Sequence, residues 1–354
     1  MDSFIKRSFP IPHFLLPPRL SVDVCDGCLR FFELSRRPDS YFPKNFGVLP
    51  FPHVHMGKLG EKEGAEAKAA LGSFVRERGY KRAHVIVHEG ESYVFCVTVK
   101  TTERRELRSA IEAVLEENVP IPPAEAVFEY EVIDVDRVRG ETRVAVSVVS
   151  EKTLSNYVDV FKSAGLSPVS FETEARALAR ALFLPQDRAT RVVVSVGRNH
   201  SMVFITKGSA VVFSSAIEIG SFDIEAQIAG VFGISADDAQ ALKEQKGFTG
   251  ESEDRELFAA MSPAFSTVRD ELDKVVSYWR GQGRRGADVE EISEIVLCGR
   301  DGALLGFSRY LSTPSRLHVR LGSVWTGLVL PKTIVPDIPF NDSLDYGAVI
   351  GGLV

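Results

Sequence analysis

Two glycine turns, each between apolar strands, are the features of this sequence best suited to bind a phosphate. The first lies in the hairpin predicted for residues 20–34 and contains Gly27. The second contains Gly197, follows the β-branched run of residues 192–196, and opens a further pair of strands within residues 191–215. A strand that passes through such a turn into a hairpin can direct backbone N–H groups at a phosphate. Two such hairpins far apart in one chain predict a duplicated architecture with a cleft between its halves.

The composition is that of an ordinary globular protein. The 354 residues are 44% hydrophobic and 25% charged, and the length alone predicts about two domains. The net charge of −6 argues against a nucleic-acid-binding protein built on a basic face. No apolar run is long enough for a transmembrane helix. We expect residues 1–18 to form an extended arm, because prolines interrupt them and no signal-peptide cleavage site follows. Without such a signal, the four cysteines indicate a reducing cytoplasm.

Apolar periodicity places helices and strands in turn along the chain. The expected helices cover residues 61–78, 102–118, 150–165, 174–184, 222–232, 235–246, 256–279 and 304–311. The expected strands cover residues 20–24, 29–34, 83–87, 93–99, 126–132, 143–149, 169–171, 192–196, 202–205, 210–213 and 292–298. The expected N-caps are Thr102, Ser150 and Ser235. Pro263 is expected in the first turn of the longest helix, and residues 35–59 in a loop or an edge strand.

Residues 107–182 carry a family likeness in the order and spacing of their motifs. They begin with LRSAIEAVLEENVPIPPAEAVFEYEV (residues 107–132), in which a helix ends at a proline-rich turn before a strand. They continue with VAVSVVSEKTLSNYVDVFKSAGLSPVSFETEARALARAL (residues 144–182). On these segments, and on residues 217–243, the chain resembles the PilM family of actin-like type IV pilus assembly proteins, which are relatives of the cell-division protein FtsA. The likeness covers most of the chain after the N-terminal arm.

The resemblance implies an α/β fold with two duplicated actin-like (RNase-H-like) domains, an interdomain cleft and a small inserted α+β subdomain. The insertion would divide the first domain into two segments, and the linker at residues 185–187 would end that domain. The expected division is residues 1–18 (extended arm), 19–91 and 167–189 (first domain), 92–166 (inserted peptide-binding subdomain) and 190–354 (second domain, with 222–290 as its smaller helical part).

The resemblance also implies a nucleotide site in the cleft. The positions that match the family's motifs are Asp23, Gly27, Gly197, Lys243 and Gly299. Cys25 stands where the family has a glycine, and its Cβ would obstruct the approach of the backbone to a phosphate. Ser195 replaces an aspartate that would hold metal-bound water. The other departures are Arg30 for lysine, Gln240 for glutamate and Arg300 for glycine. We therefore expect a weak or vestigial site for ATP and Mg²⁺, no required cofactor, and no catalytic or metal-binding residue.

The favoured hypothesis is a cytoplasmic scaffold of type IV pilus assembly. The resemblance implies that it docks the cytoplasmic N-terminal tail of a PilN-like protein between the first domain and the insertion, and so lies at the inner membrane through that partner. A homo-oligomeric ring and a pilus motor ATPase are further candidate partners. The alternatives are an active actin-like ATPase or phosphotransferase, which needs carboxylates facing the cleft, and the actin-like cytoplasmic component of type II secretion.

Three weaker motifs have simple interpretations. Cys25 and Cys28 match C-x-x-C, which is typical of a redox pair or half a zinc site, but further ligands are lacking and we expect two small apolar residues. Residues 281–286 match G-x-G-x-x-G but follow a helix, so we expect a helix end and a flexible basic loop. His84 and His88 lack a third ligand nearby and are expected to be ordinary strand histidines.

Overall fold

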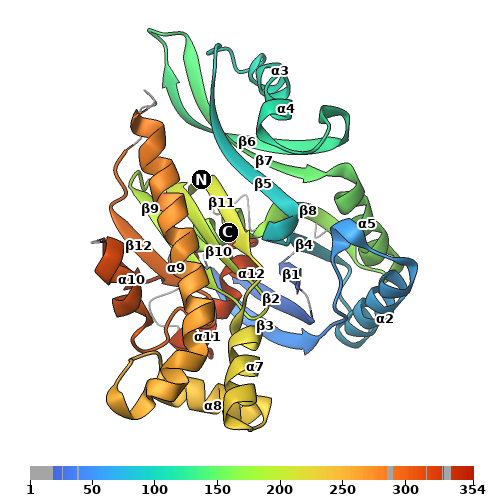
Figure 1. Cartoon of the computed structure of the whole chain (residues 1–354). Coiled ribbons are helices and arrows are strands. Elements are labelled where there is room, and N and C mark those ends of the chain that lie inside the picture. Colours follow the sequence, from blue (N-terminus) through green and yellow to red (C-terminus); the bar gives the residue numbers. More distant parts are fainter. Residues whose placement is uncertain are drawn as a thin grey trace.

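Three β-sheets organise the chain in the computed structural model, which describes residues 19–25, 27–37, 40–284, 290–315, 317–328, 330 and 336–354 (Figure 1). The predicted N-terminal arm and the last part of the predicted basic loop lie outside these ranges. Two of the sheets have five strands each and share one topology, in which three antiparallel strands are followed by two parallel ones. This repetition is the duplication that the two hairpins predicted.

The first sheet has the strand order β3-β2-β1-β4-β8. Its strands are β1 (Leu20–Cys25), β2 (Cys28–Arg37), β3 (Ser40–Pro50), β4 (Arg82–Val87) and β8 (Ser167–Thr173). Helices α2 (Glu61–Arg78) and α5 (Glu151–Ser163) cover one face, where Val22, Leu71 and Phe161 share a core. The segment predicted as a loop or an edge strand is therefore the edge strand β3. Helix α5 lies within residues 92–166 but packs on this sheet.

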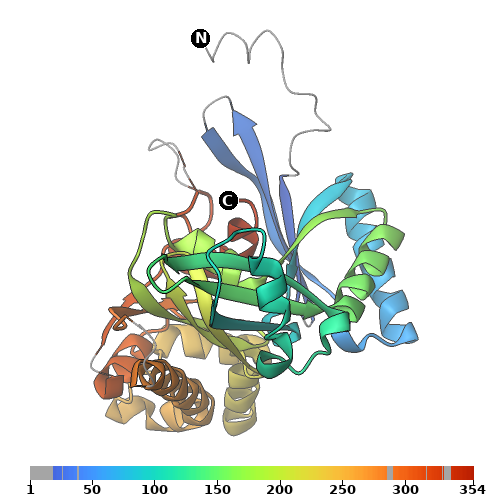
Figure 2. The same ribbon diagram turned by 90° about the horizontal axis from the view of Figure 1, so that it is seen from above.

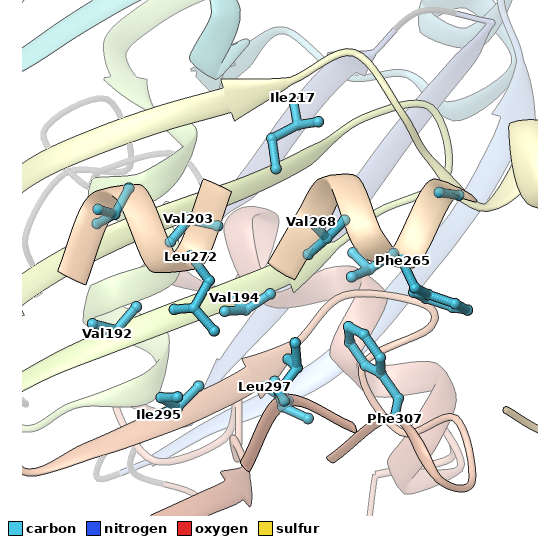
Figure 3. Packing of buried hydrophobic residues seen from close by; sticks show 14 of the residues in the cluster. Val192, Val194, Val203, Ile217, Phe265, Val268, Leu272, Ile295, Leu297 and Phe307 are labelled. Atoms are coloured by element: carbon cyan, nitrogen blue, oxygen red, sulfur yellow. The ribbon is translucent and has the colours of Figure 1, made fainter. Parts of the chain in front are cut away.

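The second sheet has the order β11-β10-β9-β12-β13. Its strands are β9 (Thr190–Val196), β10 (Ser201–Lys207), β11 (Ala210–Ile217), β12 (Glu294–Cys298) and β13 (His318–Leu321). Alternate residues of β9 point to opposite faces. Val192 and Val194 belong to the core under α9 (Arg255–Arg284), to which that helix contributes Phe265 and Leu272 (Figure 3). The all-apolar pattern of this strand thus reflects burial on both sides.

The two sheets meet through a shared core that contains two helices, α6 (Glu174–Leu182) and α12 (Gly347–Gly351). Helix α12 is the red helix beside the C-terminus in Figure 2. The alanine-rich sequence of α6 allows close approach on several sides, and four of its alanines are fully buried. At Gly351 an added Cβ would lie 1.7 Å from the carbonyl oxygen of Ala177. The two helices are therefore in backbone contact, and they connect the halves of the molecule.

The third sheet has the order β5-β7-β6 and lies beside the other two (Figure 1). Its strands are β5 (Ser92–Val99), β6 (Ala126–Asp136) and β7 (Glu141–Ser150), and α3 (Leu107–Glu112) and α4 (Leu115–Asn118) cover one face. The opposite face carries Ala145, which joins the core of the second sheet. This sheet thus contacts the second domain as well as the first.

The remaining helices complete the second domain and the connections. They are α7 (Ser221–Phe232), α8 (Ala236–Lys246), α10 (Phe307–Ser315) and α11 (Phe340–Ser343). The 3-10 helices are η2 (Met56–Lys58), η3 (Glu89–Glu91), η4 (Pro123–Glu125), η5 (Ser252–Asp254) and η6 (Leu344–Tyr346). Within the described ranges, no helix combines the length and the apolar character needed to cross a membrane.

Two local predictions are confirmed and two are wrong. Ser150 and Ser235 accept hydrogen bonds from the first turns of α5 and α8, as expected of N-caps. Thr102 caps no helix, because α3 begins only at Leu107. Pro263 is not in the first turn, since α9 already begins at Arg255. The buried residues of the turns before the proline hold that segment helical through tertiary packing.

Candidate functional site

A buried ionic cluster lies between the two large sheets, beside the first hairpin. Arg30 on β2 donates to Oδ2 of Asp23 on β1 (2.9 Å) and to Oδ1 of Asp345 in η6 (3.0 Å). Oδ2 of Asp345 is 3.8 Å from Nε of Arg198, in the turn after β9. The two aspartates share Arg30, a residue that is only 5% exposed. Asp345 therefore joins an arginine of the first sheet to an arginine of the second.

Three further buried side chains form a second polar connection. Nε2 of His88, just after β4, lies 3.1 Å from Nδ1 of His200, in the turn before β10. Nε2 of His200 is 2.8 Å from Oε2 of Glu174, the first residue of α6. The N–H of Gly90 donates to Nδ1 of His88 (3.0 Å), which leaves the proton of the neutral ring on Nε2. When His200 is neutral, His88 therefore donates to His200, and His200 donates to Glu174.

Burial and mutual contact shift the pKa values of these groups. Burial, aided by His200, lowers the pKa of His88 to about 3. Burial opposes the ionisation of Glu174, but His200 outweighs it and lowers the pKa of that carboxyl to about 2. Burial likewise opposes the charging of His200, and Glu174 outweighs it and raises the His200 pKa. Burial raises the pKa of Asp23 to about 7. The positive charge of Arg30 lowers it only in part, and Arg30 also donates to Asp345. Each charge therefore depends on an internal partner.

Little space remains between the two hairpins. A cavity of about 20 Å³ lies there, enough for about one water molecule. Its lining includes Arg30, Ser195, Gly197, His200, Gly299 and Asp345. A Cβ at Gly197 would lie 2.7 Å from the carbonyl oxygen of His200, and one at Gly299 would lie 2.5 Å from that of Val196. The two glycines thus allow close contact between backbone segments of the second domain.

The predicted nucleotide residues do not all meet in space. Gly197 and Gly299 line the small cavity, and the buried carboxylate of Asp23 is bound by Arg30 behind it. Gly27 has a left-handed backbone with φ of 79°, and a Cβ there would lie 2.7 Å from Cε1 of His53. The conformation and the tight contact with His53 explain this glycine.

Lys243 is fully buried and its amine is saturated. Its Nζ lies 2.8 Å from Oε1 of Glu225 and 2.9 Å from Asp301, and it also donates to the hydroxyl of Ser221. A lysine ammonium group has three hydrogens to donate. Because these three partners accept all of them, the amine has no donor left for a ligand in this arrangement.

A larger hollow of about 740 Å³ opens where the second domain meets β3. Arg300 points along its wall and donates to Glu244 (3.1 Å). Arg198 lies there with its guanidinium 5.2 Å from the ring centre of Phe222. The lining also includes the carboxylates of Glu244, Asp301, Asp342 and Asp345. Both signs of charge are therefore present, without a net excess of basic groups.

The cysteine hairpin differs from its prediction. Cys28 is buried and disulfide-bonded, so the expectation of a small apolar thiol is wrong. Cys25 is its backbone register partner across the hairpin, and register partners are the closest positions of two antiparallel strands. Among the described residues, no group of three or more His, Cys, Asp or Glu side chains could hold a metal ion.

The residues that join the two sheets carry no recognisable motif in the sequence. They are His88, Glu174, His200 and Asp345. Each stands at the end of a strand or in the first turn of a helix, and such ends converge at the cleft of an α/β fold. A polar residue directly beside a buried strand was the available signal: His88 directly follows β4, and His200 directly precedes β10.

A second candidate surface lies along the strand edges of the first and third sheets. Among the described strands, β6 pairs with β7 alone and β8 with β4 alone. The outer residues of β6 include apolar side chains that are 42–45% exposed, namely Val127, Val132 and Val135. Val169 on β8 is 42% exposed. Burial raises the pKa of Glu172 on β8, and the nearby carboxylate of Glu131 on β6 contributes to that rise.

Two hollows flank the central part of β6. One, of about 480 Å³, is lined by residues 131–134 together with Pro185, Arg188 and Lys207. The other, of about 720 Å³, is lined by Tyr130, Val132 and Val135 together with residues of the α3 segment. An edge strand with unpaired backbone groups and a hollow on each side can accept an extended peptide.

Comparison with known proteins gives the family. Residues 21–345 match the family model described as "Type IV pilus assembly protein PilM". The chain belongs to the PilM family. No curated protein matches it in sequence. The structure titled "PilM-PilN type IV pilus biogenesis complex" is similar with a TM-score of 0.74 and 16% identity, over 95% of this chain and 100% of that chain.

More distant structures share the fold of this PilM-family chain. MreB5 of Spiroplasma citri bound to ADP has a TM-score of 0.55 and 11% identity, over 95% of this chain and 94% of that chain. The ethanolamine utilization protein EutJ from Carboxydothermus hydrogenoformans has a TM-score of 0.53 and 15% identity, over 100% of this chain and 95% of that chain. These likenesses confirm the predicted actin-like α/β fold.

Proposed function

We propose that this protein is a scaffold of type IV pilus assembly that docks the cytoplasmic N-terminal tail of a PilN-like inner-membrane protein. Membership of the PilM family and the likeness to a PilM–PilN complex support the partner class. Docking would hold the protein in the cytoplasm at the inner membrane. The role is one of binding and positioning, and it requires no chemistry in the cleft.

The edge of β6 is the proposed docking surface. Its main-chain groups would pair with an extended peptide, and the hollows beside Val132 would take alternate side chains. Exposed acidic side chains, Glu129 and Glu131, alternate with the apolar ones. The tail that fits best therefore carries apolar and basic residues in alternation. This edge, with its two hollows, is the observation on which the proposal depends.

We infer that the residues around the small cavity between the hairpins do not fit the phosphates and metal of Mg²⁺–ATP. The cavity between the hairpins holds about one water molecule, and Asp23 and Lys243 are both occupied by internal partners. Ser195 offers no carboxylate to hold metal-bound water. These observations support a scaffold rather than the alternative ATPase or phosphotransferase, so we derive no catalytic step.

Titration of the full chain with a synthetic peptide of the PilN-like tail tests this function. Val132→Asp adds a charge at the centre of the docking edge and is expected to weaken binding by at least about tenfold. Val138→Asp is the matched control, since Val138 is 97% exposed at the hairpin tip, outside both hollows. It should change binding by less than about twofold. Equal affinities for both variants and the parent would contradict docking at β6.

A further inference from the structure

Two sets of buried contacts cross the boundary between the halves of the molecule. His88 belongs to the first sheet and His200 to the second, and their ring nitrogens are 3.1 Å apart. Arg30 belongs to the first sheet and reaches Asp345, which in turn lies 3.8 Å from Arg198 of the second. Except for Arg198, these groups are at most about one tenth exposed. In the closed cleft these buried polar groups pair with one another, because solvent does not reach them to form hydrogen bonds.

We propose that a latch of five buried side chains, Arg30, His88, Glu174, His200 and Asp345, holds the two domains closed without any ligand between them. In an actin-like fold, a ligand in the cleft would join the halves by contacting both hairpins. Here the same positions are joined by protein groups. The proposal concerns the cleft and is independent of the peptide edge on β6.

The direction of the hydrogen bonds makes the latch specific. With His200 neutral, the N–H of Gly90 donates to His88, His88 donates to His200, and His200 donates to Glu174. Every ring nitrogen in this chain is used once. Separation of the domains would leave His200 and His88 with unpaired polar atoms until water entered, and a buried unpaired group is costly.

The ion pairs of Arg30 with Asp23 and Asp345 also favour the closed cleft. Arg30 lies between two carboxylates, so loss of Asp345 leaves it with Asp23 alone. The remaining cavity holds about one water molecule, too little to solvate a separated ion pair. A nucleotide could reach the hairpins only after the latch had opened. In this protein the two domains are thus held together by side chains of the chain itself.

Hydrogen exchange of the full-length protein tests the latch. The reporters are the amides of Gly197 and Asp301, whose hydrogen bonds to the carbonyls of His200 and Val196 lie within the second domain beside the cleft, where opening would admit water. Asp345→Asn and His200→Gln each remove one latch member with little change in size. Either variant should accelerate exchange at the reporters by about tenfold or more, while α2, on the far face of the first sheet, is unchanged. Asp342→Asn, at an exposed position nearby, is the matched control and should behave as the parent.

Three results would overturn the latch. Exchange within about twofold of the parent in both variants would show that these contacts do not hold the cleft. Equal acceleration in α2 would show global destabilisation in place of domain opening. A large slowing of exchange in the parent on addition of Mg–ATP would show that a nucleotide closes the cleft. The expected result is that Mg–ATP has no effect on the parent.

Discussion

His88 and His200 lie 112 residues apart in the sequence, and their facing ring nitrogens lie 3.1 Å apart in the structure. One ring follows a strand of the first sheet, and the other precedes a strand of the second. Both are buried, and their pKa values shift in opposite directions, because burial lowers that of His88 while Glu174 outweighs burial and raises that of His200. The two histidines therefore contribute to the pH dependence of stability with opposite sign.

Below neutral pH we expect His88 to destabilise the fold. Its pKa is about 3 in the folded protein and about 6.5 when unfolded, so the unfolded chain binds the proton first. Stability falls as pH drops from about 6.5 towards 3, by about 2 kcal/mol at pH 5. Urea unfolding of His88→Gln should lack this part of the loss. The exposed control His318→Gln should retain it, and an identical loss in His88→Gln would contradict the assignment.

Above about pH 6.5, His200 has the opposite effect on stability. Its pKa is raised in the folded state by Glu174, so its contribution is complete below about pH 6.5 and is lost as pH rises through the folded value. His200→Gln should remove this decline. Unfolding measured at increasing pH above about 6.5 is the check, and a decline of the same size in the variant would exclude His200 as its source.

Arg30→Met should be strongly destabilising. It leaves Asp23 and Asp345 buried without their cation, a change that costs about 3–5 kcal/mol. The control is Arg139→Met, which breaks an exposed pair with Asp136 and should cost less than about 1 kcal/mol. The midpoints of denaturant unfolding report both. Equal midpoints would mean that the buried cluster adds nothing to stability.

Two glycine-to-alanine substitutions should act with opposite sign. Gly351→Ala drives a Cβ into the carbonyl of Ala177 where α6 meets α12, and overpacking of this kind costs about 1–3 kcal/mol. Gly230 lies inside α7 with no atom within 4 Å of an added Cβ, so Gly230→Ala should stabilise by about 0.5–1 kcal/mol. Thermal unfolding distinguishes the two. A shift in the same direction for both would refute the close contact of the two helices.

ATP turnover should be negligible. The residues at the hairpins are occupied by one another, so the purified chain and its Asp23→Asn variant should release phosphate at the same background rate. A coupled phosphate assay measures this. Robust turnover that disappears in Asp23→Asn would contradict the scaffold proposal and favour the alternative of an active ATPase.

The fold was predictable where local pattern and burial agree. The apolar run of β9 and the caps Ser150 and Ser235 are local signals, and the structure has each of them. The order of these elements carried the family likeness. Pro263 was misplaced because buried neighbours keep α9 helical before it. That effect is tertiary, so no local rule contains it.

The position of the cleft was predictable from the sequence, but the ionic contacts inside it were not. Gly197 and Gly299 do lie at one cavity. Lys243, by contrast, binds Glu225 and Asp301, which lie 18 and 58 residues away in the sequence. Arg30 binds Asp345, which is 315 residues away. Single-sequence patterns contain no information on such long-range pairing, because ionic contacts have no periodicity.

The most direct test of the account is calorimetric titration of the full-length protein with the PilN-like tail peptide, with and without Mg–ATP. A scaffold whose cleft is closed by its own side chains should bind the tail with the same affinity in both conditions, and Val132→Asp should weaken binding in both. Binding that occurs only with Mg–ATP, or that ignores Val132→Asp, would contradict the central claim.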